Sequence, residues 1–246
     1  MGDRLDRRDG SAGATHPGPC KGWGVTRSED HGPGTGDEAR SPLADFGPRS
    51  WATPEVTGIG RLPTSTYLAR PDVVSLDGSW SFVLRERPAA VTVDDLVGST
   101  ASWGEVEVPG CWTMQGHDRP QYTNIQMPFP GPPSSVPDHN PTGVYRRTVT
   151  LPAGWAGQRA VLHVRGAETV LYVHVDGRPV AMGKDSRLPH EVDLTEVVEP
   201  GVPFELALTV VRWSDATYLE DQDHWHHAGL HRSVFVYATP PVHVAD

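Results

Sequence analysis

The chain has 246 residues, of which 37% are hydrophobic, and its 26 glycines and 24 prolines indicate extensive loops. A formal net charge of -10 argues against nucleic acid and anionic membranes as partners, because both attract clustered Lys and Arg. No stretch approaches the roughly 18 apolar residues that span a bilayer, and residues 1–10 lack the apolar core of a secretory signal. We therefore expect a soluble, cytoplasmic protein, with Cys20 and Cys111 as free thiols.

Residues 1–48 are predicted to be a disordered tail. They are rich in Gly, Pro, Ser, Asp and Arg, and their apolar residues are too sparse to offset the entropy of ordering. A folded domain is expected over residues 49–242. Residues 243–246 are interpreted as the start of a linker to a further domain that this sequence lacks.

Short strands are predicted along the rest of the chain, because apolar residues repeat with a period of two. The residues that share a strand face are Leu76, Trp80, Phe82 and Leu84; Val106 and Val108; Tyr145, Val149 and Leu151; Phe204, Leu206, Leu208 and Val210; and Val234 and Val236. Asp176-Gly177 predicts a hairpin turn. Residues 92–98 and 194–198 could each form about one helical turn. This pattern favours an all-β, antiparallel β-sandwich.

A long, proline-rich loop is predicted over residues 109–143. Loops of that length are usually functional or disordered, and the aromatic residues Trp112, Tyr122 and Phe129 favour an ordered one. Sugars are bound by planar polar side chains and by aromatic rings. The segments 121–124 and 212–215 both offer such side chains.

Short motifs follow one another in a recognisable order along the chain. They are Asp77-Gly78-x-Trp80-x-Phe82, Val108-Pro109-x-x-Trp112, Tyr122-Thr123-Asn124, Asn140-Pro141-Thr142-Gly143-x-Tyr145, Gly183-x-Asp185-Ser186-Arg187-Leu188-Pro189, Arg212-Trp213-Ser214-Asp215, Tyr218-Leu219-Glu220-Asp221-Gln222-Asp223-x-Trp225, Gly229 and Arg232. From about residue 50 to 242, this ordered set resembles the N-terminal sugar-binding domain of the LacZ-type β-galactosidases of glycoside hydrolase family 2.

The resemblance implies a galactose-binding-like jelly roll and two substrate-binding residues. Asn124 corresponds to a residue that contacts the galactoside. Asp215 corresponds to one that contacts the sugar and also ligates a sodium ion. Carboxylate and carbonyl oxygens suit such a hard cation. The other sodium ligands of the family come from a later barrel domain, so this chain is expected to hold a partial sodium site.

The resemblance also implies that the catalytic groups lie outside this sequence. The family cleaves glycosides with two glutamates, which belong to the later barrel, as does the magnesium site. The chain is therefore expected to be the non-catalytic, truncated part of a carbohydrate-metabolising β-galactosidase, inactive alone. Its expected partners are the galactoside, the missing barrel and, through Pro128 to Pro137, further copies of itself. The alternatives are a stand-alone, lectin-like carbohydrate-binding module and a complementation partner of a separately encoded barrel.

Several polar residues of the last motifs are expected to be structural. Glu220, Asp221 and Asp223 are expected to pair with Arg187 or Arg232 rather than to catalyse. Asp185 and Arg187 are expected to form a buried pair. Trp213 and Trp225 are expected to wedge their loop into the core rather than to stack on a sugar. An ordinary loop role is favoured over zinc binding for His224, His226, His227 and His231.

Overall fold

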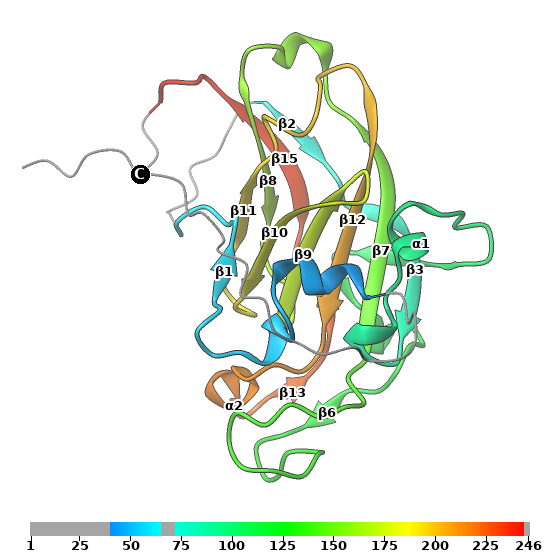
Figure 1. Ribbon diagram of the computed structural model, residues 1–246, viewed down its shortest axis with the longest axis vertical. Helices are drawn as coiled ribbons and strands as arrows, with labels where there is room; N and C mark the ends of the chain where they lie inside the picture. The colour runs from blue at the N-terminus through cyan, green and yellow to red at the C-terminus, as the bar shows by residue number, and fades with distance from the viewer. Residues whose placement is uncertain (1–39, 65–71, 244–246) are drawn as a thin grey trace, which may run out of the picture. The chain divides into compact units, whose positions relative to one another are not determined.

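The computed structural model describes residues 40–64 and 72–243, which all belong to one unit, Glu38–Asp246. Two antiparallel sheets form this unit (Figure 1). The larger sheet has the strand order β1 (Gly58–Ile59), β10 (Arg178–Lys184), β9 (Val170–Val175), β12 (Pro203–Val211), β7 (Thr142–Thr150), β3 (Gly78–Arg85) and β4 (Gly104–Val108). The smaller sheet has the order β11 (His190–Asp193), β8 (Arg159–Val164), β15 (Val234–Thr239) and β2 (Val73–Ser75).

Short elements complete the unit. Two further strand pairs join β6 (Gln121–Tyr122) to β13 (Trp225–His226) and β5 (Gly110–Cys111) to β14 (Gly229–Leu230). The α-helices are α1 (Val93–Val97) and α2 (Thr217–Glu220), and the 3-10 helices are η1 (Pro42–Phe46), η2 (Ser50–Ala52), η3 (Pro88–Ala90), η4 (Trp112–Met114) and η5 (Ala153–Trp155). Within residues 40–64 and 72–243, no helix is long and apolar enough to cross a membrane.

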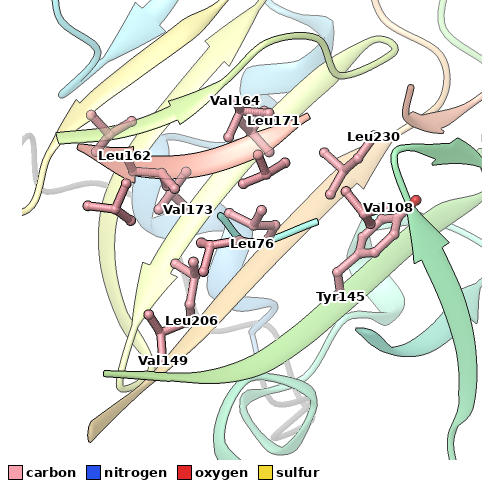
Figure 2. Close-up of a cluster of buried hydrophobic side chains, with 14 of the residues drawn as sticks. Leu76, Val108, Tyr145, Val149, Leu162, Val164, Leu171, Val173, Leu206 and Leu230 are labelled. Carbon is pink, nitrogen blue, oxygen red and sulfur yellow. The ribbon is translucent and has the colours of Figure 1, made fainter. Parts of the chain in front are cut away.

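The main core lies between the two sheets. Its side chains come from alternate positions of the strands, such as Leu206 and Leu208 on β12 and Leu162 and Val164 on β8. Figure 2 shows how the side chains of the two sheets meet, with Tyr145 at one end of the cluster. The predicted all-β sandwich is therefore confirmed, and so are the strand faces read from the apolar alternation.

A second, smaller apolar cluster covers the outer face of the larger sheet. Helix η1 lies against this face (Figure 1), where Leu43 and Phe46 are buried. The Phe46 ring lies 5.4 Å from the rings of both Tyr172 and His174. The prediction of a disordered tail is therefore wrong for residues 40–48, because these two apolar side chains dock on the sheet. The rest of that prediction, residues 1–39, lies outside the described residues.

Turn chemistry follows the sequence closely. Asp176 and Gly177 join β9 to β10 with φ values of 49° and 74°, and two positive φ values are what a tight two-residue hairpin requires. Helix α1 falls within the predicted segment 92–98 and begins with a capping box in which Thr92 and Asp95 bond to each other's backbone amides. Cys111 is a free thiol, and Cys20 lies outside the described residues.

Candidate functional site

The long loop 109–143 is ordered and joined to the segment after β12. Tyr122 pairs with Trp225 across β6 and β13, and Cys111 pairs with Gly229 across β5 and β14. Figure 1 shows β6, β13 and α2 at the same end of the sandwich. The fold therefore brings the two segments with predicted sugar-binding residues, 121–124 and 212–215, to one end of the domain.

Asn124 follows β6 and is exposed. Its side-chain amide donates to the hydroxyl of Tyr122 at 3.4 Å, and that hydroxyl donates to the carboxylate of Asp223. The neighbouring Thr123 is buried, and its hydroxyl donates to Asp221 at 2.5 Å. These bonds fasten the loop to the acidic segment after α2 and leave the Asn124 side chain at the surface.

Asp215 follows β12 and is 8% exposed. Its backbone amide donates to the carbonyl oxygen of Trp51 at 3.3 Å. Its Oδ1 accepts a hydrogen bond from the ammonium group of Lys184 at 2.6 Å, and the same ammonium donates to the carbonyl oxygen of Thr53 at 2.8 Å. Lys184 ends β10 and was not predicted from the sequence. The signal for it was a lysine directly after the apolar run 180–183 of that strand.

The contacts of Asp215 test whether a sodium ion fits there. Hard cations prefer carboxylate and carbonyl oxygens. Here those oxygens, from Asp215 and Thr53, already hold the ammonium of Lys184. A second positive charge beside that ammonium would be repelled by it. The residues present therefore do not fit a sodium ion at this oxygen of Asp215.

Trp213 is a buried anchor of the site loop. The ring is 4% exposed, stacks on His226 with centroids 4.4 Å apart, and meets the edge of Phe129 at 5.1 Å. The guanidinium of Arg212 lies 4.7 Å from the centroid of the Trp213 ring and forms an ion pair with Asp118. The structural role predicted for Trp213 is confirmed.

Trp225 departs from its prediction. Its side chain is 59% exposed, and its ring lies 5.7 Å from that of Tyr122, which is also exposed. The prediction that Trp225 wedges into the core is wrong, because β13 pairs with the short surface strand β6 rather than with a sheet of the sandwich. The two rings form an open aromatic patch beside Asn124.

The acidic residues are structural, as predicted, but the expected arginine partners are wrong. Glu220 accepts hydrogen bonds from the backbone amide and hydroxyl of Ser186 at 2.7 and 2.6 Å. Asp221 and Asp223 accept from the hydroxyls of Thr123 and Tyr122. Hydroxyl groups of neighbouring loops reach these carboxylates directly, so arginine is not needed.

Asp185 and Arg187 also differ from expectation. Oδ1 of Asp185 accepts from the backbone amides of Arg187 and Leu188, each at 2.8 Å. The side chain of Arg187 turns instead to Glu168, 3.4 Å away, and to His224, 2.7 Å away. The predicted pair is therefore wrong, because the carboxylate closes a local turn and the guanidinium neutralises a buried glutamate.

The histidine segment makes ordinary loop contacts. Burial, reinforced by the charge of Arg212, lowers the pKa of His226 to about 3, so its ring is neutral where it stacks on Trp213. Nδ1 of His227 lies 3.0 Å from the hydroxyl of Thr113. In the described part of the chain, no group of three or more His, Cys, Asp or Glu side chains is arranged to hold a metal ion.

Hollows in the surface lie beside these residues. One of about 330 Å³ is bounded by Asp118, Phe129 and Trp213. A larger one of about 650 Å³ is bounded by Arg49, Trp51 and Arg87 and includes neither predicted sugar-binding residue among its lining. Neither Asn124, which is exposed, nor Asp215, which is 8% exposed, lines these two hollows.

Comparison with known proteins agrees with these observations. The family description "Glycosyl hydrolases family 2, sugar binding domain" matches residues 73–240. A β-galactosidase of Erwinia tasmaniensis is 38% identical over 213 residues, covering 80% of this chain and 21% of that protein. One from Vibrio cholerae is 40% identical over 174 residues, covering 70% of this chain and 17% of that protein. The chain thus spans about a fifth of these relatives.

Solved structures support the fold. A β-glucuronidase of an uncultured Clostridium species superposes with a TM-score of 0.53 at 18% identity, covering 73% of this chain and 31% of that one. A β-glucuronidase of Bifidobacterium dentium gives a TM-score of 0.52 at 19% identity, covering 72% and 32% of the two chains. The family match and the fold together identify the chain as a member of the sugar-binding domain family of the family 2 glycosyl hydrolases.

Proposed function

We propose that this chain is the sugar-contacting, non-catalytic part of a β-galactosidase, in which Asn124 and Asp215 contact the terminal galactose. Asn124 follows β6 and Asp215 precedes α2, two elements that lie at the same end of the sandwich (Figure 1). This placement carries the proposal, in a chain 38% identical to a β-galactosidase over most of its length. Cleavage of the glycosidic bond is assigned to residues outside this chain.

The chemistry of the two side chains suits sugar hydroxyls. The carboxamide of Asn124 both donates and accepts hydrogen bonds, and it lies at the surface. A carboxylate accepts at both oxygens, so Asp215 can hold the ammonium of Lys184 and a sugar hydroxyl together. Buried neighbours fix the position of Asp215, which reduces the entropy lost when a sugar binds.

The carboxylates near the site support a non-catalytic role. Glycosidic cleavage needs one carboxylic acid that protonates the leaving oxygen and a second carboxylate that acts as nucleophile or base. Glu220, Asp221 and Asp223 instead each accept hydrogen bonds from the surrounding loops. These bonds hold the loop that carries Asp215, which suits a supporting role.

An assay of hydrolysis by the purified chain tests the proposal that the chain contacts the sugar without cleaving the glycosidic bond. We expect no turnover of a nitrophenyl β-galactoside above a blank that contains the same chain unfolded in denaturant. Turnover that follows the amount of folded chain would contradict the proposal. It would also mean that carboxylates of this chain form a complete catalytic pair.

A stand-alone, lectin-like module is the second candidate, and the exposed pair of Tyr122 and Trp225 favours it. Aromatic rings beside polar side chains commonly bind the apolar face of a sugar, and Asn124 bonds to this pair. Calorimetry with galactose or lactose separates the candidates. Millimolar or tighter binding that is lost in Trp225→Ala favours the lectin-like module, whereas no binding by the isolated chain favours the enzyme part.

A further inference from the structure

Lys184 and Asp215 form a buried ion pair at the proposed galactose contact. Their side chains are only 5% and 8% exposed, and Nζ lies 2.6 Å from Oδ1. A buried charge persists in a folded protein when it is paired and hydrogen-bonded. The ammonium meets this requirement, because it also donates to the carbonyl oxygen of Thr53 at 2.8 Å.

The oxygens around the ammonium are of the kind that would hold a bound cation. The ammonium lies between one carboxylate oxygen and one carbonyl oxygen, the two kinds of ligand that small hard cations choose in proteins. The stem of Lys184 reaches this position from the end of β10. The Thr53 carbonyl follows η2 and the Asp215 carboxylate follows β12, so three separate segments converge on one positive charge.

We infer that Lys184 is a built-in cation that replaces a sodium ion at Asp215, so that this side of the site works without sodium. The inference rests on the proposed galactose contact of Asp215 for its functional meaning. Lys184 is a positioning residue in this view. It holds the carboxylate in place and balances its charge, while the other carboxylate oxygen remains for a sugar hydroxyl.

A tethered ammonium differs from a free ion in one measurable way. A free sodium ion that binds only the folded state stabilises it more as the sodium concentration rises, whereas a lysine side chain is always present. The folded state should therefore show no preference for sodium over another monovalent cation. Removal of the lysine should expose an oxygen-lined space that a small cation can enter.

The experiment measures thermal unfolding in sodium, methylammonium and choline chlorides at matched ionic strength, which equalises screening. We expect one melting temperature for the wild-type chain in all three salts. Lys184→Ala should melt lower in choline, which is too large for the space, and recover in sodium or methylammonium. The double variant Lys184→Ala/Asp215→Asn should show no such recovery.

Arg159→Ala is the matched control. It breaks a different ion pair, Arg159 with Asp193, in which both side chains are partly exposed. Its melting temperature should not depend on which cation is present. A loss of stability shared by both variants reflects a broken ion pair, whereas recovery by small cations in Lys184→Ala alone reports a cation position at Asp215.

Two results would overturn the inference. One is failure of every small cation to raise the melting temperature of folded Lys184→Ala. The other is stabilisation of the wild type by sodium over choline that disappears in Asp215→Asn; this result also decides the matter if Lys184→Ala does not fold. Because neither readout involves sugar or turnover, the outcome is independent of whether the proposed function holds.

Discussion

Three buried histidines should make the fold sensitive to acid. His174, His190 and His226 are no more than 6% exposed. Burial is the main cause that lowers the pKa of His174 and His190 to about 4 and that of His226 to about 3, from an ordinary value of 6.5. All three rings are therefore neutral in the folded chain at neutral pH.

The unfolded chain binds more protons than the folded chain below about pH 6.5, because its histidines titrate normally. Their contribution to stability is therefore complete above that pH and is lost as the pH falls toward the folded pKa values. At about pH 5, each of the three rings costs about 2 kcal/mol, or about 6 kcal/mol together. Domains are stable by only about 5–15 kcal/mol, so this loss is a large fraction of the free energy of unfolding.

Urea unfolding followed by tryptophan fluorescence at several pH values measures this loss. His226→Phe keeps a ring that can stack on Trp213 but cannot be protonated, so its free energy of unfolding should fall less steeply with pH. His139→Gln is the control, because His139 is exposed, and it should follow the wild type. A free energy of unfolding that is the same at about pH 7.5 and about pH 5 would refute the reasoning.

Four substitutions test the packing of the site and of the outer face by urea unfolding. Phe46→Ala should cost about 3 kcal/mol, because it removes a ring buried against the larger sheet; no change would mean that η1 does not dock. Thr123→Val should cost about 1 kcal/mol, because it removes the hydroxyl that bonds to Asp221, and an unaltered midpoint would count against that bond. Trp213→Ala should cost about 3 kcal/mol or more and the exposed Trp225→Ala less than about 0.5 kcal/mol; equal costs would contradict their different burial.

The strands of the sandwich could be predicted from the sequence because burial of one strand face produces an alternation of apolar and less apolar residues. Phe204, Leu206 and Leu208 alternate with less apolar residues because one face of β12 lies in the core. The turn at Asp176 and Gly177 could also be predicted, since few residue pairs tolerate two positive φ values.

Contacts between distant segments could not be predicted in this way. Leu43 and Phe46 are isolated in a polar, glycine-rich stretch, so no periodic pattern of apolar residues indicates that they dock on the larger sheet. Arg146 follows the core residue Tyr145 on β7 and points away from the core, yet it is buried because it pairs with Glu205 and bonds to the carbonyl of Gly98 at the end of α1. Its burial depends on covering segments that the strand pattern does not reveal.

The candidate site was likewise predictable only in part: its two residues were predicted, but their contacts were not. Resemblance to a family supplied Asn124 and Asp215, which lie next to β6 and α2 in the sequence, and these two elements share one end of the sandwich (Figure 1). The partners that fix them were not foreseen. Lys184 is 31 residues from Asp215 in sequence, and the hydroxyls of Tyr122 and Thr123 reach the acidic loop only after β6 pairs with β13. An acidic residue known only from the sequence does not reveal which neighbouring side chain will pair with its carboxylate.

A chimeric enzyme gives the most direct test of the proposed galactose contact. In it, residues 40–243 replace the matching segment of the Erwinia tasmaniensis β-galactosidase, and kcat/KM is measured for a nitrophenyl β-galactoside. Asn124→Ala should lower kcat/KM by about tenfold, the effect of one lost hydrogen bond to the substrate. Gln126→Ala, at an exposed position two residues further along the same loop, should leave it unchanged. Equal kcat/KM values for both variants of an active chimera would contradict the account.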